Sequence, residues 1–396
     1  MTTMLIAMLF TCQFPTLGHE DGYRGDETEL RNFEYNGEYF LNLLAFSFDR
    51  EWVERWHESK RGYRTTVGSV RSTEFYFFQE LKVEFEPVKN TFFNIHYLQS
   101  EDFDSRYEKT RLEFRHLIKK KWVIGVQTEL SPFKENDDLG FSIGYKNKLR
   151  LSYNMPDFQF DRKSDEGETF IRSPKTLRLQ LMLNPFERVN LYLDVGRNMP
   201  MEQESLKDQF RFSYEKTFYR GMVTYQLREN TWLQFLFNGE ETDKNRTMLG
   251  VDPHGSYDLQ RESDYVRVEL TRHLLNQRQF SAGLTWFQMN EETVFPNLET
   301  GLEIQDFDEE TLYFSFQHRF KTKMGMRYSL YYAKVDDIKD IIHTQADSTR
   351  DNSTQIKLGT LFFYSPRKHF DIIFNPTFDL DTPEFDGGNI RLQALF

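Results

Sequence analysis

Apolar and polar residues alternate with a period of two along most of the chain. Residues 176–183 read TLRLQLML and place four leucines on one face of a strand, with Arg178, Gln180 and Met182 on the other. After the turn-forming stretch NPFER, the segment RVNLYLDVG repeats the alternation. Period-two alternation that is interrupted by a short turn predicts an antiparallel β-hairpin.

This hairpin unit recurs along the chain. Eight such units lie between residues 81 and 374, residues 389–396 add a strand, and residues 35–48 are a candidate for the first. Connections between hairpins, such as residues 238–263, are long and mostly acidic, whereas several turns within hairpins carry Lys or Arg. We therefore predict an all-β fold, a single transmembrane antiparallel β-barrel of about 18 strands (or 16), with short periplasmic turns and long outer loops.

Two segments depart from the simple pattern. In residues 210–227 the apolar positions are even as far as Tyr214 and odd from Val223 onward. One register cannot place both sets on the same face, so we predict a bulge near residues 219–221 or an extra turn. In residues 50–70, Trp52 and Trp56 have the i, i+4 spacing of a short helix in the first loop.

The N-terminal stretch MTTMLIAMLFTCQFPTLGHE has a short apolar run followed by small residues. We expect a signal peptide over residues 1–18, a periplasmic segment over residues 19–34 and the barrel over residues 35–396. A disordered tail is the alternative, because no Lys or Arg precedes the run. Cys12, the only cysteine, lies in this stretch, so the mature chain would form neither a disulfide nor a zinc–thiolate site.

Composition requires that polar and apolar residues be separated locally. The mean hydropathy is −0.68, yet 16% of the residues are aromatic, which is typical of a folded chain rather than a disordered one. The formal net charge of −12 argues against nucleic acid as a partner, since phosphate binding needs a basic face.

Alternation alone also fits a soluble β-sheet with one wet face. Three features favour a membrane instead. Connection lengths alternate between short and long, aromatic residues such as Trp122, Trp232 and Tyr364 stand next to turns, and the polar face carries charges in mid-strand. Aromatic girdles and a polar interior are typical of membrane barrels.

The chain resembles bacterial outer-membrane β-barrel proteins of the porin-like group. The resemblance rests on the N-terminal stretch, the hairpin rhythm and the last strand, which ends in phenylalanine. The positions that match the family's assembly signal are Ile390, Leu392, Ala394 and Phe396; the family often has an aromatic residue where this chain has Ala394. The resemblance implies a location in the bacterial outer membrane. It also implies three partners: outer-membrane lipid, lipopolysaccharide and the barrel-assembly machinery.

No sequence pattern indicates catalysis, a metal site or a cofactor. The nucleophile motif G-x-S-x-G, the phosphate loop and the dinucleotide fingerprint are all absent from the sequence. Acidic stretches at residues 306–310 and 379–388 lack the spacing of a calcium-binding EF-hand. We predict that the protein is not an enzyme and requires no metal or cofactor.

Charged side chains opposite the apolar face are predicted to line the lumen. This set comprises Arg115, Arg150, Arg178, Arg211, Arg267, Arg319, Arg327, Arg391, Glu113, Glu269, Asp194 and Asp371. The guanidinium groups suit an anion-lined path for acidic saccharides. The competing hypothesis pairs them with carboxylates, including Glu129 and Glu215, in a ladder that stiffens the barrel.

We predict a channel that passes small hydrophilic solutes across the outer membrane, with a preference for anions or acidic saccharides as a sub-hypothesis. The alternative is a non-conducting barrel that serves as an adhesin, an assembly factor or an export scaffold through its acidic loops. A soluble secreted β-protein is the third interpretation.

Overall fold

A computed structural model describes residues 60–396 except 71–73, 102–105, 131–137, 147, 156–174, 206–209, 250–255, 275–277, 296–300, 322, 343–345 and 368. The regular structure in these ranges is β-strand throughout, in one 18-stranded sheet. Within the same ranges, no helix is long and apolar enough to cross a membrane.

The first half of the sheet has strands of moderate length. They are β1 (Arg61–Val70), β2 (Glu74–Val88), β3 (Thr91–Glu101), β4 (Arg106–Ile118), β5 (Trp122–Leu130), β6 (Asp138–Tyr145), β7 (Leu149–Met155) and β8 (Thr176–Phe186). The strands that follow are β9 (Val189–Ser205), β10 (Phe210–Arg228), β11 (Thr231–Met248), β12 (Tyr257–Leu274), β13 (Arg278–Phe295), β14 (Gly301–Lys321), β15 (Met324–Ile342), β16 (Ala346–Arg367), β17 (Phe370–Asp379) and β18 (Glu384–Leu395).

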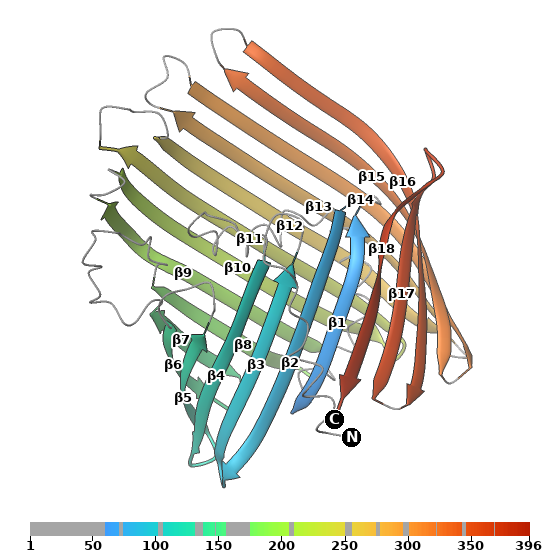
Figure 1. Ribbon diagram of the computed structural model, residues 1–396. Coiled ribbons are helices and arrows are strands. Elements are labelled where there is room, and N and C mark those ends of the chain that lie inside the picture. The colour runs from blue at the N-terminus through green and yellow to red at the C-terminus, as the bar shows by residue number, and fades with distance from the viewer. Residues whose placement is uncertain are drawn as a thin grey trace, which may run out of the picture.

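The sheet closes on itself (Figure 1). Each strand pairs antiparallel with the next, and β1 pairs with both β2 and β18, so that Tyr63 lies between Leu81 and Ala394. Closure removes the free strand edges that an open sheet would expose. The predicted fold class, an antiparallel barrel of 18 strands, is confirmed.

The strand that closes the ring comes from a segment for which the sequence pattern was ambiguous. Residues 61–70 form β1. From Gly62 to Val70, β1 pairs residue by residue with β18, without a register shift. Their alternation is weak because Gly and Thr occupy several positions, which hides the apolar face. Trp52, Trp56 and residues 35–48 lie outside the described residues.

The predicted bulge near residues 219–221 is wrong. Strand β10 pairs with β11 in a single register from Phe210 to Gln226. Its pairing with β9 shifts between Tyr214 and Lys216, but the extra residue there belongs to β9. Its even positions Phe210 and Tyr214 are buried, whereas its odd positions Tyr219 and Tyr225 are exposed. One face therefore changes from aromatic to mixed composition along the strand, and the backbone does not shift to follow the aromatic residues.

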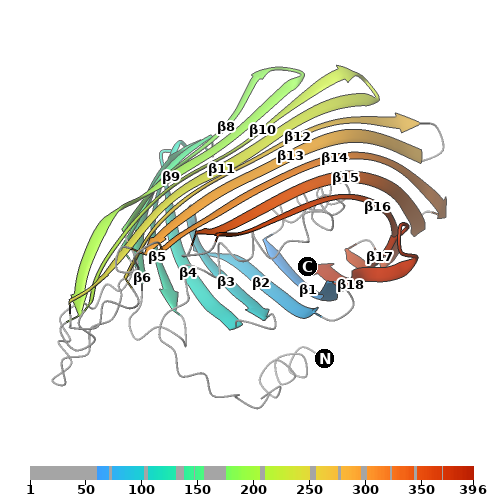
Figure 2. The same ribbon diagram turned by 90° about the horizontal axis from the view of Figure 1, so that it is seen from above.

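Strand length divides the barrel into two walls (Figure 2). Strands β9 to β16, here called the long-strand wall, have 17 to 22 residues each. The remaining strands, here called the short-strand wall, have 7 to 15. A tilted strand needs about 9–11 residues to cross a bilayer, so the outer parts of the long-strand wall extend beyond it.

Several segments predicted as loops are therefore strand. Strand β11 continues to Met248 and β12 begins at Tyr257, which places most of residues 238–263 in the sheet. Short connections such as 89–90, 187–188 and 229–230 all lie at the opposite end, here called the short-turn end. The alternation of the two kinds of connection holds, although several of the outer connections, such as that between β11 and β12, are shorter than expected.

Candidate functional site: the lumen wall

The two faces of the barrel differ in polarity. On β14, Leu312, Phe314 and Phe316 are exposed, while the residues between them, Thr311, Tyr313 and Ser315, are buried. The same contrast of exposed apolar and inward polar positions recurs around the ring. An exposed apolar surface of this extent is not that of a monomer in water. Such an apolar belt fits the interior of a lipid bilayer. Lipid offers no hydrogen bonds to the backbone, and a closed barrel needs none because its strands satisfy one another.

The chain is a transmembrane β-barrel. An even number of antiparallel strands with an outward apolar band is the architecture of bacterial outer-membrane barrels. The predicted outer-membrane location follows from this architecture.

The strand parity places eleven of the twelve predicted lumen residues on the inward face. They are Arg115, Arg150, Arg178, Arg267, Arg319, Arg327, Arg391, Glu113, Glu269, Asp194 and Asp371. Arg211 is the exception and corrects the prediction. Because β10 keeps one register, Arg211 shares the outward parity of Tyr219 and is itself exposed. Glu215 lies on the same outward face, where Arg197 binds it.

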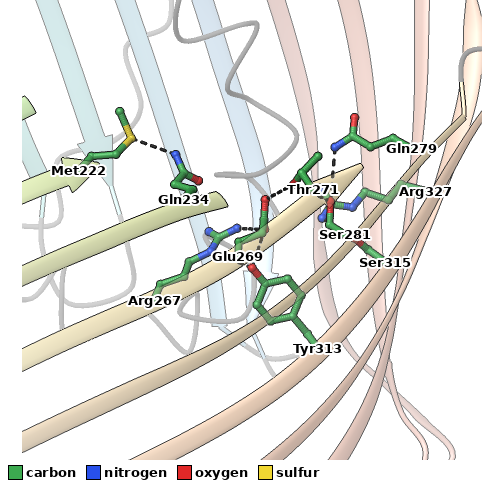
Figure 3. A network of polar contacts seen from close by, with 10 residues as sticks. All are labelled: Met222, Gln234, Arg267, Glu269, Thr271, Gln279, Ser281, Tyr313, Ser315 and Arg327. Carbon is green, nitrogen blue, oxygen red and sulfur yellow. Dashed lines mark hydrogen bonds and ion pairs between the residues drawn. The ribbon is translucent and has the colours of Figure 1, made fainter. Parts of the chain in front are cut away.

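On the long-strand wall, a buried network joins β12 to β14 (Figure 3). The Arg267 guanidinium forms an ion pair with Glu269, and its Nε donates a hydrogen bond to the Tyr313 hydroxyl at 2.8 Å. The Tyr313 hydroxyl in turn donates to Glu269 Oε2 at 2.5 Å. Arg267 is 1% exposed and Glu269 is 3% exposed. A charge pair this deeply covered must be fully satisfied by its neighbours, and this one is.

Further polar groups complete the network. Thr271 Oγ1 donates to the other Glu269 oxygen at 2.8 Å, and Arg327 Nη2 donates to Ser315 Oγ at 2.8 Å. The Tyr313 ring stacks on Tyr331 with centroids 6.0 Å apart.

Gly283, which is paired directly with Tyr313, makes room for this arrangement. A Cβ atom at Gly283 would collide with the Tyr313 ring.

On the short-strand wall, the first charged cluster joins three neighbouring strands. Arg64 of β1 pairs with Glu80 of β2, and the other Glu80 oxygen lies 2.5 Å from His96 Nε2 of β3. Glu80 is thus held by two partners, while about a quarter of the Arg64 and His96 side chains is accessible. The cluster presents the Arg64 guanidinium and the His96 ring to the interior, with the more deeply buried Glu80 carboxylate between them.

A second cluster continues along the same wall. Arg150 donates to Glu113 at 2.5 Å, and Arg115 lies 3.5 Å from the other Glu113 oxygen while also pairing with Glu84. Arg150 retains 34% of its side-chain accessibility. Alternating guanidinium and carboxylate groups therefore run across β2, β4 and β7.

The remaining inward charges lie outside these two clusters. Arg178 pairs with Asp194 through Nε and Nη2 and lies over the Phe218 ring, and its side chain is 35% exposed. Asp371 accepts a hydrogen bond from Ser365 at 2.5 Å. Arg319 lies over the Phe363 ring at 5.3 Å. Among the predicted arginines, Arg115, Arg150, Arg178 and Arg267 thus form ion pairs with carboxylates.

The predicted lumen set did not include the carboxylates of β2 or their partners. Glu80, Glu84, Arg64 and His96 all lie on the inward face. A signal was present, because even positions of β2 read Glu80, Lys82, Glu84 between apolar odd positions. Among the described residues, no group of three or more His, Cys, Asp or Glu side chains is placed to hold a metal ion.

No family model and no curated protein matches the sequence. Solved structures with a similar course of the chain include a BenF-like porin from Pseudomonas fluorescens Pf-5, with 10% identity and a TM-score of 0.42, covering 85% of this chain and 98% of that one. OmpT, an outer membrane protein of Vibrio cholerae, has 8% identity and a TM-score of 0.41, covering 85% and 96%. An anion-selective porin from Comamonas acidovorans has 11% identity and a TM-score of 0.39, covering 85% and 98%. The fold assignment itself rests on the closed ring of strands.

Proposed function

We propose that the protein is a channel for small hydrophilic solutes in the outer membrane. One observation carries the proposal: a closed ring of 18 strands turns an apolar face outward and charged side chains inward. Barrels of 16 to 18 strands are wide enough to leave an aqueous channel. Inward and partly accessible charged groups, such as Arg150 and Arg178, can interact with a passing polar solute in place of part of its water shell.

The pairing of the arginines bears on selectivity. The accessible guanidinium groups of Arg115, Arg150 and Arg178 each have a carboxylate partner, so their positive charge is largely balanced locally. We infer weak selectivity among small ions. A preference for anions or acidic saccharides requires that solutes bind the accessible N–H groups of the guanidiniums. The carboxylates must at the same time remain bound on the opposite side, away from the solute.

Planar-bilayer recording of the purified chain tests the proposal. Stable channels that tolerate applied voltage are the expected result, with reversal potentials close to zero in a salt gradient. A protein that folds and shifts its gel mobility on boiling, yet never conducts, would instead support the adhesin or scaffold alternative. Strong cation preference would contradict the sub-hypothesis of an anion path.

We also propose that the last strand serves as the assembly signal and that the outer rim contacts lipopolysaccharide. Phe396 is exposed and its backbone N–H donates to the Arg61 carbonyl at 3.2 Å, which places it at the seam of the barrel. Deleting Phe396 should lower the yield in the outer membrane far more than Leu330→Ala, a truncation in the middle of the lipid-facing belt. Equal yields would refute the role of Phe396.

A further inference from the structure

Five lysines gather on two neighbouring turns at the short-turn end. Lys119, Lys120 and Lys121 connect β4 to β5, and Lys146 and Lys148 lie between β6 and β7. The backbone N–H of Lys146 donates to the carbonyl of Lys121 at 2.7 Å, so the two turns are in direct contact. All five side chains are exposed, and together they are called the lysine patch.

Three of these lysines occupy backbone conformations that disfavour them. Lys119, Lys120 and Lys146 have φ angles of 48°, 56° and 49°. Glycine and asparagine adopt this left-handed region at lower cost and are the usual residues of such turns. Turn geometry therefore does not explain why lysine stands at these positions. A functional role for the positive charge would explain it.

Within the part of the chain that the structure describes, the positive charge of the lysine patch has no carboxylate counterpart. Among the described residues, none of the five lysines forms an ion pair with a carboxylate. Lys146 Nζ lies 5.4 Å from the centre of the Tyr145 ring. Five like charges on adjacent turns create a local positive potential that attracts anions.

The surface next to the lysine patch faces lipid. Trp122 and Tyr145, on adjacent strands, have ring centroids 5.0 Å apart, and Trp122 is 46% exposed. Above these rings, the outward positions of β5 and β6 form a continuous apolar column of Ile124, Val126, Phe141 and Ile143. Amphipathic rings of this kind lie at the headgroup level of a bilayer. The lysines, one or two residues further out, are then at the level of the headgroup phosphates.

We propose that the lysine patch binds the headgroup phosphates of anionic phospholipids in the leaflet at the short-turn end. The aromatic pair and the apolar column favour a lipid as the ligand over a soluble acidic protein. The acyl chains of a bound lipid would cover these apolar side chains, whereas an acidic protein would not. A basic segment at the surface of an anionic leaflet gains attraction from each lysine, and the attraction falls with ionic strength.

Electron spin resonance of spin-labelled lipids measures this selectivity. The full chain is reconstituted in phosphatidylcholine vesicles, and the association of labelled phosphatidylglycerol is compared with that of labelled phosphatidylcholine. We expect a preference for phosphatidylglycerol of roughly three-fold or more in low salt, which falls towards one in high salt. No preference in the unmodified chain would overturn the proposal and leave the patch to a soluble acidic partner.

The test variant carries Lys119→Asn, Lys120→Asn, Lys121→Gln, Lys146→Asn and Lys148→Gln. Asparagine suits the left-handed positions, so this variant should fold, and its shift in gel mobility on boiling checks that it does. The preference should fall towards one. Replacing the same five lysines by arginine should retain it, and Lys89→Gln with Lys323→Gln, at other turns of the same rim, should leave it unchanged.

Two outcomes would contradict the lipid assignment. A variant without the five lysines that keeps the full preference would show that other groups select the lipid. Inorganic phosphate that removes the preference, when chloride of equal ionic strength does not, would assign the patch to a soluble anion.

Discussion

The two walls of the barrel hold their inward charges in different ways. On the long-strand wall, Arg267 and Glu269 are almost completely covered by Tyr313 and neighbouring side chains. On the short-strand wall, Arg150 and Arg178 pair with carboxylates but keep about a third of their surface accessible. The same residue types thus form a sealed network on one side and a wetted one on the other.

This difference separates structure from transport. A covered ion pair has no contact with a passing solute, and removing one partner leaves an unpaired charge in a poorly solvated place. An accessible pair is screened by water and contributes little to stability, but it is where a solute would meet charge. Stability is therefore expected to respond to the long-strand wall, and ion selectivity to the short-strand wall.

The largest expected effect is that of Glu269→Gln on stability. The substitution leaves the buried Arg267 guanidinium without its counter-charge, and breaking a buried pair costs about 3–5 kcal/mol. Urea unfolding of the detergent-folded barrel, followed by tryptophan fluorescence and by gel mobility, measures the loss.

Glu113→Gln is the matched control for this substitution, since it removes a buried carboxylate whose partners Arg115 and Arg150 keep 27% and 34% of their side-chain surface accessible. It should cost less than Glu269→Gln, because water still solvates the two guanidinium groups that lose their partner. Equal losses for the two variants would remove the distinction between the walls.

The next effect is that of Gly283→Ala. The added methyl group would meet the Tyr313 ring, which must move and release its bonds to Arg267 and Glu269. Overpacking of this kind costs about 1–3 kcal/mol. If the collision is the cause, combining Gly283→Ala with Tyr313→Ala should cost less than the sum of the two single substitutions, and additive losses would argue against it.

The fold could be predicted from the sequence because the lipid belt imposes period two. Within the bilayer every outward position, such as Phe314, must be apolar. The strands, their number and the terminal strand that contains Leu392 could therefore be predicted from the alternation. The inward parity of Arg178 or Glu269 follows from the same alternation. Which arginine is buried and which is accessible to water could not be predicted, since this depends on neighbours such as Tyr313 that are distant in the chain.

The outer parts of the strands could not be predicted for a physical reason. Beyond the bilayer both faces of a strand meet water, and the requirement for an apolar side chain disappears. Residues 240–247 of β11 are polar on both faces, so their sequence resembles that of a loop although they continue the sheet. The same loss of constraint in β10 allowed Arg211 to be placed on the wrong face.

A smaller effect is expected on ion selectivity. Glu113→Gln leaves Arg115 and Arg150 without the carboxylate that they share, which adds one positive charge to the accessible wall. The ratio of anion to cation permeability should rise roughly two-fold, because a charge at the wall of a wide, wet pore is partly screened. Reversal potentials in a salt gradient measure it. Glu269→Gln should leave the ratio unchanged, and a shift of equal size would show that the buried network also faces the path.

The smallest effect is expected where the long-strand wall extends beyond the membrane. Asp308 and Asp336 lie directly opposite each other on β14 and β15. Desolvation and nearby carboxylates raise the pKa of Asp308, whereas a hydrogen bond from Arg350 lowers the pKa of Asp336. A raised pKa favours the folded state at low pH, and this contribution is lost as pH rises through the folded pKa; a lowered pKa acts in the opposite sense. Asp308→Asn should therefore raise the urea midpoint slightly at neutral pH and Arg350→Gln should lower it slightly, and both differences should vanish once the carboxyl groups are protonated. A loss of stability in Asp308→Asn at neutral pH would mean that this carboxylate has a stabilising partner outside the acidic pair.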